Sequence, residues 1–542
     1  MPEERPSVLT PDEASSPDAD LSTLAPLRWP VFRMLWLVWL ASNICMWMND
    51  VAAAWLMTSL TTSPVWVALV QTAATMPVFL FGLPSGALAD IVDRRRFYIT
   101  TQFWVASVAL LLCATVLTGT VTPPLLLLLT FANGIGLAMR WPVYSAVVPE
   151  LIPRAQLPAA LALNGITMNA SRIVGPLLAG ALIASIGSAA VFVLNAVLSL
   201  ASAFMLMRWQ REHKPDPLGR QRLWSAMRVG VQFVRQSPRL KAVLLRIALF
   251  FFHSTALIAL LPLVARGLQG GDAATFTVLL ASMGMGAIAT AFLMPRLRQL
   301  LARDQVVLYG TLLQSGATLV MAFASNVAVA VPAMFVAGMA WIATANSLSV
   351  SAQLALPDWV RARGMSIYQM AIMGASAFGA GLWGQVAALG TVQRSLLVAA
   401  LTGGTAMWLA TRFVVDLQIE EDLSPSHALP VPVAAQPPAT GHVLVSIDYR
   451  IDPTRAADFE RVMQDSRRSR LAQGALEWHL LRDISDPGHY TEQIVDESWT
   501  EHLRRFDRVT GADIALRERK LAFHLEEAPP RVTRYAIDTP RT

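Results

Sequence analysis

The sequence predicts an all-α polytopic membrane protein, with about twelve transmembrane helices in two six-helix halves and a small α+β domain behind them. Apolar residues make up 54% of the 542 residues and charged residues only 15%, whereas a soluble protein carries about 25% charged residues. Most of the apolar runs approach or exceed the roughly 20 residues that a helix needs to cross a bilayer. The charged residues gather at both ends and in short loops, which is typical of membrane helices with soluble appendages.

Each segment follows from its composition. Residues 1–27 are polar and rich in Pro, Ser and Asp, without the apolar core of a signal peptide, and predict a disordered cytoplasmic tail. The N-terminal half covers residues 28–207, a linker covers 208–241, and the C-terminal half covers 242–416. We expect the twelve spans at about residues 31–60, 65–89, 97–118, 125–147, 159–184, 189–207, 242–265, 273–295, 305–323, 327–350, 362–386 and 395–415.

The linker between the halves carries an apolar stripe from Leu223 to Val234, with arginines on the other faces. This pattern predicts an amphipathic helix along the cytoplasmic membrane surface, or a plain linker helix.

Basic residues are distributed very unevenly between the two sets of loops. Loops assigned to one side hold eighteen Lys and Arg residues, and the opposite loops hold only Arg266 and Arg394. The positive-inside rule therefore places both termini in the cytoplasm of a multi-pass protein of the inner (plasma) membrane. The net charge of +6 is explained by topology and contact with anionic lipid rather than by nucleic-acid binding.

The only two cysteines, Cys45 and Cys113, both fall in apolar spans. Such a pair builds neither a disulfide framework nor a cysteine-based metal site. We expect no metal and no cofactor.

The two halves echo each other. Pro149-Glu150 and Pro357-Asp358 lie 208 residues apart near the ends of the fourth and tenth spans, and an Arg-Ala pair follows each within a few residues. The spans that come next are rich in glycine. This repetition predicts two copies of a six-helix unit.

A short charged loop joins the second and third spans. Its Gly86, Leu88, Ala89, Asp90, Arg94 and Arg95 resemble the loop signature of the major facilitator superfamily, although Asp93 stands where the family usually has Gly. The resemblance implies the major facilitator fold and a gating latch formed by Gly86, Asp90, Arg94 and Arg95. The alternative is that the arginines only fix topology.

Ionisable side chains inside membrane spans are functional candidates, because burying a charge in lipid is costly. Asp50 lies well inside the first span, and Arg172 lies near the middle of the fifth. A carboxylate and a guanidinium at similar depth could neutralise one another, with a proton or the substrate competing for the pair. A static ion pair, or an Asp50 that snorkels to the outer surface, is the alternative.

Other polar and aromatic side chains fall in the same spans. Asn43 and Trp47 lie near Asp50, Arg140 lies lower in the fourth span, and Asn346 lies in the tenth. Spans four and ten line the central cavity in the superfamily, so we expect these residues to contribute to a cavity for substrate and protons. His253 in the seventh span is a further candidate, with helix packing as its alternative role.

The fifth span contains Arg172-x-x-Gly175-Pro176-x-x-Ala179-Gly180. It resembles the Gly-Pro motif of superfamily antiporters and therefore favours export. Small residues let helices pack closely, and Pro176 removes a helical hydrogen bond so that the helix can bend.

The chain changes character after the last span. Residues 417–440 form a Pro- and Ala-rich linker, and residues 441–538 have the composition of a soluble domain. Its predicted βαββαβ order resembles the ferredoxin-like half of a dimeric α/β barrel, which implies that the domain pairs with a second copy. Its histidines and acids show no spacing that specifies a metal, haem or nucleophile site.

The order of the whole chain, the pair Trp47-Met48 and the run Val148–Arg154 resemble the secretion-effector branch of the major facilitators, which is related to enterobactin exporters and macrolide efflux pumps. This resemblance implies a transporter rather than an enzyme, with proton-driven export of a small amphiphilic molecule such as a siderophore, drug or secondary metabolite. The alternatives are an importer or uniporter of the same fold, or a membrane-tethered enzyme or sensor that acts through the C-terminal domain.

Overall fold

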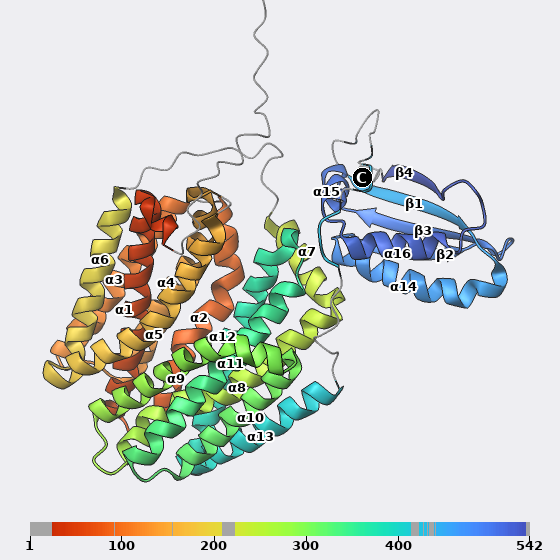
Figure 1. Ribbon diagram of the computed structural model, residues 1–542. Coiled ribbons are helices and arrows are strands. Elements are labelled where there is room, and N and C mark those ends of the chain that lie inside the picture. The colour runs from red at the N-terminus through yellow and green to blue at the C-terminus, as the bar shows by residue number, and fades with distance from the viewer. Residues whose placement is uncertain are drawn as a thin grey trace, which may run out of the picture.

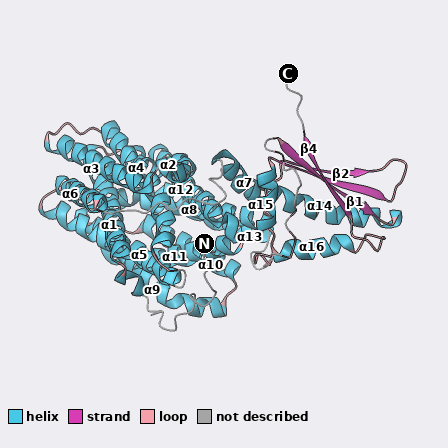
Figure 2. Ribbon diagram, turned by 90° about the horizontal axis from the view of Figure 1, so that it is seen from above, coloured by secondary structure: helices cyan, strands magenta, loops and turns pink. Residues whose placement is uncertain are grey.

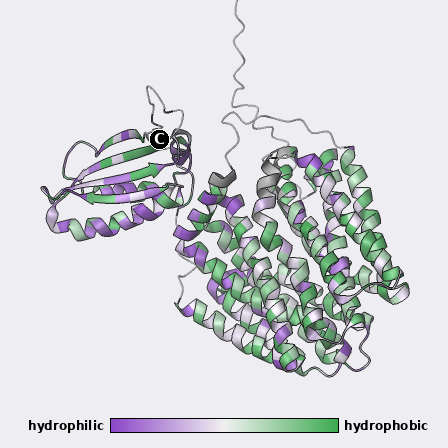
Figure 3. Ribbon diagram, turned by 180° about the vertical axis from the view of Figure 1, so that it is seen from behind, coloured by the Kyte–Doolittle hydropathy of each residue, from purple (hydrophilic) through white to green (hydrophobic). Residues whose placement is uncertain are grey.

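The structure is a computed structural model that describes residues 24–91, 93–153, 156–208, 223–413, 422–426, 428–430, 432, 438 and 441–537. Within these ranges twelve helices are long and apolar enough to cross a membrane, which confirms the predicted fold class. They are α1 (Pro30–Leu60), α2 (Pro64–Ile91), α3 (Arg94–Leu117), α4 (Pro123–Leu151), α5 (Leu157–Ser185), α6 (Ser188–Met207), α8 (Pro238–Gly267), α9 (Ala273–Leu300), α10 (Arg303–Phe323), α11 (Val327–Leu354), α12 (Asp358–Leu389) and α13 (Val392–Phe413). Figure 1 shows them packed as one bundle, and Figure 3 shows how apolar their residues are.

The helices begin where the sequence supplies a suitable first turn. Pro30, Pro123 and Pro238 occupy the first turns of α1, α4 and α8, where a missing N–H breaks no helical hydrogen bond. Asp272 caps α9 by accepting a hydrogen bond from the backbone N–H of Thr275 at 2.8 Å. Most helices run a few residues past the apolar segments, because regular hydrogen bonding continues into the polar rim of the bundle.

The start of α1, the adjoining ends of α2 and α3, and the soluble domain lie at one end of the bundle, which we call the terminal face. We call the opposite end the far face (Figure 1). The two halves meet along α2 and α12, where the Thr72 hydroxyl donates to the carbonyl of Ala377 at 2.8 Å. They meet again near the far face, where Gly180 of α5 lies against Thr277 of α9. These contacts hold the halves together at the far face and along the middle of the bundle.

The C-terminal domain is a four-stranded sheet with two helices on one side (Figure 1). Its elements are β1 (His442–Arg450), α14 (Ala456–Ala472), β2 (Glu477–Arg482), β3 (His489–Asp496), α15 (Trp499–Asp507), α16 (Gly511–Leu521) and β4 (Arg531–Ile537). The strand order is β2-β3-β1-β4, and each neighbouring pair is antiparallel. Side chains of β3 alternate in burial, with Glu492 and Ile494 fully buried beneath α14 and α16.

The soluble domain docks on the C-terminal half through α7 (Leu223–Gln236), the helix predicted in the linker. Figures 1 and 2 show α7 beside the domain. Arg228 of α7 forms a 2.6 Å ion pair with Glu497, and the Gln232 amide donates to the carbonyl of Ala475 at 3.2 Å. Gly474 has φ +109°, a conformation that favours glycine, and a side chain there would meet Val229 at 2.9 Å.

The opposite side of α7 packs on the first turns of α12. The rings of Phe233 and Trp359 meet edge-on at 5.7 Å. The Arg508 guanidinium of the soluble domain lies 5.3 Å from the Trp359 ring centroid. The helix α7 therefore lies between the soluble domain and a membrane helix that touches the other half.

Candidate functional site

The deepest candidate residues lie where α1 and α5 pack together. The guanidinium carbon of Arg172 lies 5.3 Å from the ring centroid of Trp47. Asp50, three residues further along α1, is half-buried and has no hydrogen bond or ion pair with another residue that the structure describes. The arginine and the carboxylate are thus not paired, and Trp47 occupies the face of the guanidinium.

The Gly-Pro motif explains how Arg172 reaches Trp47. A Cβ on Gly175 would lie 2.5 Å from the Cβ of Trp47, so only glycine lets α5 approach α1 this closely. Pro176 lies inside α5 and has no N–H, which leaves the carbonyl of Arg172, four residues earlier, without its helical partner. Gly180 serves the other side of the helix and faces Thr277 of the other half. One motif therefore positions Arg172 and closes the contact between the halves.

The structure reveals a regular feature of α1 that our sequence analysis missed. Three tryptophans recur at intervals of eight residues, or about 12 Å along a helix, and each carries a guanidinium from another helix. The pairs are Trp39–Arg140 at 5.5 Å, Trp47–Arg172 at 5.3 Å and Trp55–Arg266 at 4.9 Å, measured from the guanidinium carbon to the ring centroid. We call these three pairs the ladder. The eight-residue spacing of tryptophan was the sequence signal. Arg140 and Arg172 stood out as charges inside membrane spans, but nothing in the sequence paired them, or Arg266, with these tryptophans.

The ring contacts offset part of the cost of the two arginines inside the bundle, Arg140 and Arg172, whereas Arg266 is exposed in the last turn of α8. An arginine at the centre of a membrane helix costs about 2.5–3.5 kcal/mol on insertion scales, and a desolvated cation–π contact contributes about 2 kcal/mol. None of the three arginines forms a hydrogen bond or ion pair with a described residue, so the ring contact is the polar interaction that the structure shows for each. Arg246 of α8 differs, because Asp304 pairs with it at 2.8 Å.

Arg140 occupies the most enclosed of the three positions. It is only 4% exposed, and its Nε has no hydrogen-bond partner among the described residues. Trp39 beneath it stacks on Tyr144, with ring centroids 4.1 Å apart, and meets Trp141 at 5.5 Å. No carboxylate among the described residues forms an ion pair with Arg140. The site is therefore cationic and aromatic.

The other predicted cavity residues have local partners. The Asn43 amide donates to the carbonyl of Trp39 at 2.7 Å, and Asn346 accepts a 2.9 Å hydrogen bond from Arg298. His253 donates its Nδ1–H to the carbonyl of Leu249 at 2.7 Å. Asn43 is buried on α1 and Asn346 is exposed on α11, whereas the partner and ring contacts of His253 suit helix packing.

The loop signature falls at the junction of α2 and α3. The surroundings of Gly86 and the side chain of Asp90 lie outside the described part of the structure. Asp93, the departure from the family pattern, caps α3 by accepting hydrogen bonds from the backbone N–H groups of Arg95 and Arg96. Its φ of −57° needs no glycine, which explains why the departure is tolerated. Arg95 donates to the carbonyl of Met207 at 2.5 Å and so ties α3 to the end of α6, and Arg94 begins α3.

A buried charge cluster fills the core of the soluble domain. Glu492 accepts hydrogen bonds from Trp478 at 2.9 Å and Ser466 at 2.7 Å, and Lys520 lies 3.3 Å away. Burial raises the pKa of Glu492, but Lys520, Arg470 and these hydrogen bonds outweigh it and hold the pKa at about 2. Burial lowers the pKa of Lys520 to about 8, and Glu492 opposes that shift. These groups satisfy one another, as in a structural core.

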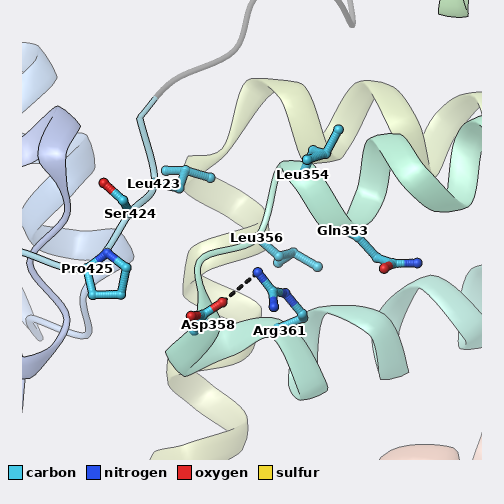
Figure 4. A pocket seen from close by; sticks show the side chains of 8 residues that line it. All are labelled: Gln353, Leu354, Leu356, Asp358, Arg361, Leu423, Ser424 and Pro425. Carbon is cyan, nitrogen blue, oxygen red and sulfur yellow. Dashed lines mark ion pairs between the residues drawn. The ribbon is translucent and has the colours of Figure 1, made fainter. Parts of the chain in front are cut away.

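No group of three His, Cys, Asp or Glu side chains in the described ranges is placed to hold a metal. A pocket of about 230 Å³ lies at the domain junction, between the turn from α11 to α12 and the linker at Leu423–Pro425. Figure 4 shows it with the 2.6 Å ion pair between Asp358 and Arg361. It is an open surface pocket outside the membrane core.

Sequence comparison identifies relatives of one kind. A family model described as transmembrane secretion effector matches residues 21–541. The chain is 19% identical to the staphyloferrin A transporter of Staphylococcus aureus over 46% of its own length and 63% of that protein. It is 24% identical to macrolide efflux protein A of Streptococcus pyogenes over 48% of its length and 65% of that protein. The chain thus spans less than two thirds of these relatives.

Solved structures share the fold of the membrane helices. The chain matches a bacterial homologue of the human lysosomal transporter Spinster with a TM-score of 0.56 and 16% identity, over 71% of this chain and 97% of that one. It matches a POT family transporter in complex with 5-aminolevulinic acid with a TM-score of 0.60 and 12% identity, over 71% and 96%. At these identities the likeness concerns the fold alone.

Proposed function

The chain belongs to the transmembrane secretion effector family of major facilitator transporters, and on that premise we propose that it exports a small amphiphilic molecule in exchange for protons. The substrate class is that of siderophores, drugs and secondary metabolites. The family and its relatives are transporters, not enzymes.

The proposal of proton coupling depends on one observation, the unpaired carboxylate of Asp50 in a membrane helix. Asp50 is half-buried in α1, about one turn from Trp47, without an ion-pair partner among the described residues. A carboxylate in such a place can gain and lose a proton as the surrounding helices move. Movement of α5 toward or away from α1 changes the distance from Arg172 to Asp50, and with it the preference for the ionised form.

Proteoliposomes with an imposed pH difference test this role. We expect Asp50→Asn to abolish accumulation of substrate against its gradient while passive exchange continues, and Asp50→Glu to retain part of the accumulation. Proton-driven accumulation by Asp50→Asn would refute the assignment and leave His253 as the next candidate. A survey of compounds retained by cells with and without the protein supplies the substrate for the assay.

Export rather than import is supported by the Gly-Pro motif of α5 and by the macrolide efflux relative. The excess of basic residues in the loops of the terminal face supports cytoplasmic termini in a plasma membrane. Uptake measured in inverted and right-side-out vesicles decides between an exporter and an importer or uniporter of the same fold.

A second candidate function assigns the activity to the C-terminal domain as an enzyme or sensor. The docking of that domain on α7 favours instead a part in the transport cycle. Deleting residues 424–542 separates the two, because loss of efflux with normal membrane insertion supports coupling and unchanged efflux supports an independent domain.

We also expect the soluble domain to pair with a second copy through the sheet face that its helices leave uncovered. This face carries Leu481 and Tyr535, which are 47% and 54% exposed. Pairing would bury such apolar surface. Sedimentation of residues 441–538 checks it, and a monomer at tens of micromolar, the range of ordinary homodimer assays, would contradict it.

A further inference from the structure

The ladder runs along most of α1 and joins both halves of the protein. Arg140 comes from α4 and Arg172 from α5, both in the N-terminal half, whereas Arg266 comes from the last turn of α8 in the C-terminal half. Trp39 lies nearest the terminal face, and Trp55 lies nearest the far face. The three positive charges are therefore spread along the direction in which a transported molecule must pass.

The charges of the ladder do not balance. The three guanidinium groups have no counter-charge, because no described residue forms an ion pair with any of them or with Asp50, the one carboxylate of α1. At Arg140, the Nε and the indole N–H of Trp39 are both buried donors without a described acceptor. A buried cation and buried donors together favour a group that brings negative charge and oxygen acceptors.

The aromatic side chains around the arginines indicate what the remainder of such a molecule is like. Trp39, Trp141 and Tyr144 form an aromatic cluster at Arg140, and Phe276 stacks on Trp55 at 5.9 Å near the far face. Aromatic surface beside a guanidinium suits a molecule that joins an apolar or aromatic body to an anionic group.

We propose that the transported molecule is an amphiphilic organic anion, and that the ladder provides its successive counter-charges, beginning at Arg140. This inference rests on the proposed transport function and names the chemical class of its substrate. The aromatic body lies against the tryptophan rings, and the carboxylate-type group pairs with a guanidinium. Trp55 and Arg266 come from different halves, so opening of the far face separates the last pair and releases the anion there.

Three fluorescent probes that share one dansyl ring test the proposal: dansylglycine is an anion, dansylamide is neutral, and dansylcadaverine is a cation. Their binding to the full-length protein in phosphatidylcholine vesicles is measured by dansyl emission sensitised by tryptophan. We expect dansylglycine to bind at least about tenfold more tightly than the other two, because hydrogen bonds to a charged group are among the stronger polar contacts.

The variants locate the source of this preference. Arg140→Gln is expected to reduce the preference for the anion to within about twofold, the scale of a neutral contact, and Arg140→Lys is expected to keep most of it. Arg412→Gln removes the same charge from the exposed last turn of α13 and should change nothing. Arg172→Gln is a second test within the ladder if Arg140→Gln does not fold.

Equal binding of the three probes by the wild-type protein would overturn the proposal, as would an undiminished preference in the variants of Arg140 and Arg172. Proton-driven transport is measured separately in the same vesicles. Transport without a preference for anions would refute this inference and leave the proposed function intact. Tight binding of the anion without transport would refute the proposed function and leave this inference intact.

Discussion

Gly180 offers the sharpest test of how the two halves move. A Cβ built on Gly180 lies 1.9 Å from the Thr277 hydroxyl oxygen and 2.6 Å from the Thr277 Cβ. A rotamer change can move the hydroxyl but not the Cβ. Carbon atoms in contact need about 3.5–4.0 Å, so Gly180→Ala forces α5 and α9 roughly 1 Å apart in the closed arrangement of the far face.

The strain applies only while the far face is closed. Overpacking a tight contact costs about 1–3 kcal/mol, and a difference of that size shifts an equilibrium by about 5–150-fold. We therefore expect Gly180→Ala to raise the ratio of far-open to far-closed protein by a factor in that range, and to slow transport because one half of the cycle becomes unfavourable.

Spin labels at Ser185 and Ala274, exposed positions at the far-face ends of α5 and α9, report the change as a longer distance population. The native cysteines interfere little, because Cys45 is 3% and Cys113 is 6% exposed. Gly165→Ala is the matched control, since it lies on the same helix and a Cβ there meets no atom within 4 Å. An unchanged distance distribution in Gly180→Ala, or an equal change in Gly165→Ala, would refute the reasoning.

Three further outcomes are expected. Reversing the charge of Arg228 or of Glu497 alone should increase hydrogen exchange in α7, because it weakens a half-exposed ion pair that contributes about 0.2–1 kcal/mol. Reversing both charges together should restore protection. Equal exchange in the two single variants and the double variant would show that the pair contributes nothing. Glu492→Gln should lower the midpoint of thermal unfolding of the soluble domain, because a buried cation left without its partner costs about 3–5 kcal/mol, and adding Lys520→Met should recover part of it. In the wild-type domain the pKa of Glu492 lies at about 2, below its ordinary value of 4.5, so the stability from this group is present above pH 4.5 and is lost as the pH falls toward 2, which acid titration of the unfolding midpoint checks. Asp90→Asn should slow efflux with normal membrane insertion if the loop is a latch, whereas wild-type efflux would leave only a topological role.

Hydropathy and charge determined the membrane architecture directly from the sequence. The twelve helices follow the twelve apolar runs because lipid forces every backbone polar group to bond within its own helix, which is a local requirement. The helix at Leu223 was also predictable, because an amphipathic stripe appears at helical spacing along the chain itself. Asp50, Arg172 and Arg140 could be singled out because a charge inside an apolar run is costly wherever its partners lie.

Only the tertiary structure decided what these residues contact. The sequence suggested that Asp50 and Arg172 pair, but close packing at Gly175 brings Arg172 over Trp47 instead. Gly180 belongs to the same motif as Gly175, yet its neighbour is a threonine almost a hundred residues away in the other half. The eight-residue spacing of tryptophan in α1 can be read from the chain, whereas its arginines come from three other helices. Contacts between helices depend on how whole helix faces pack. The spacing of residues along one helix does not determine which face of another helix it will meet.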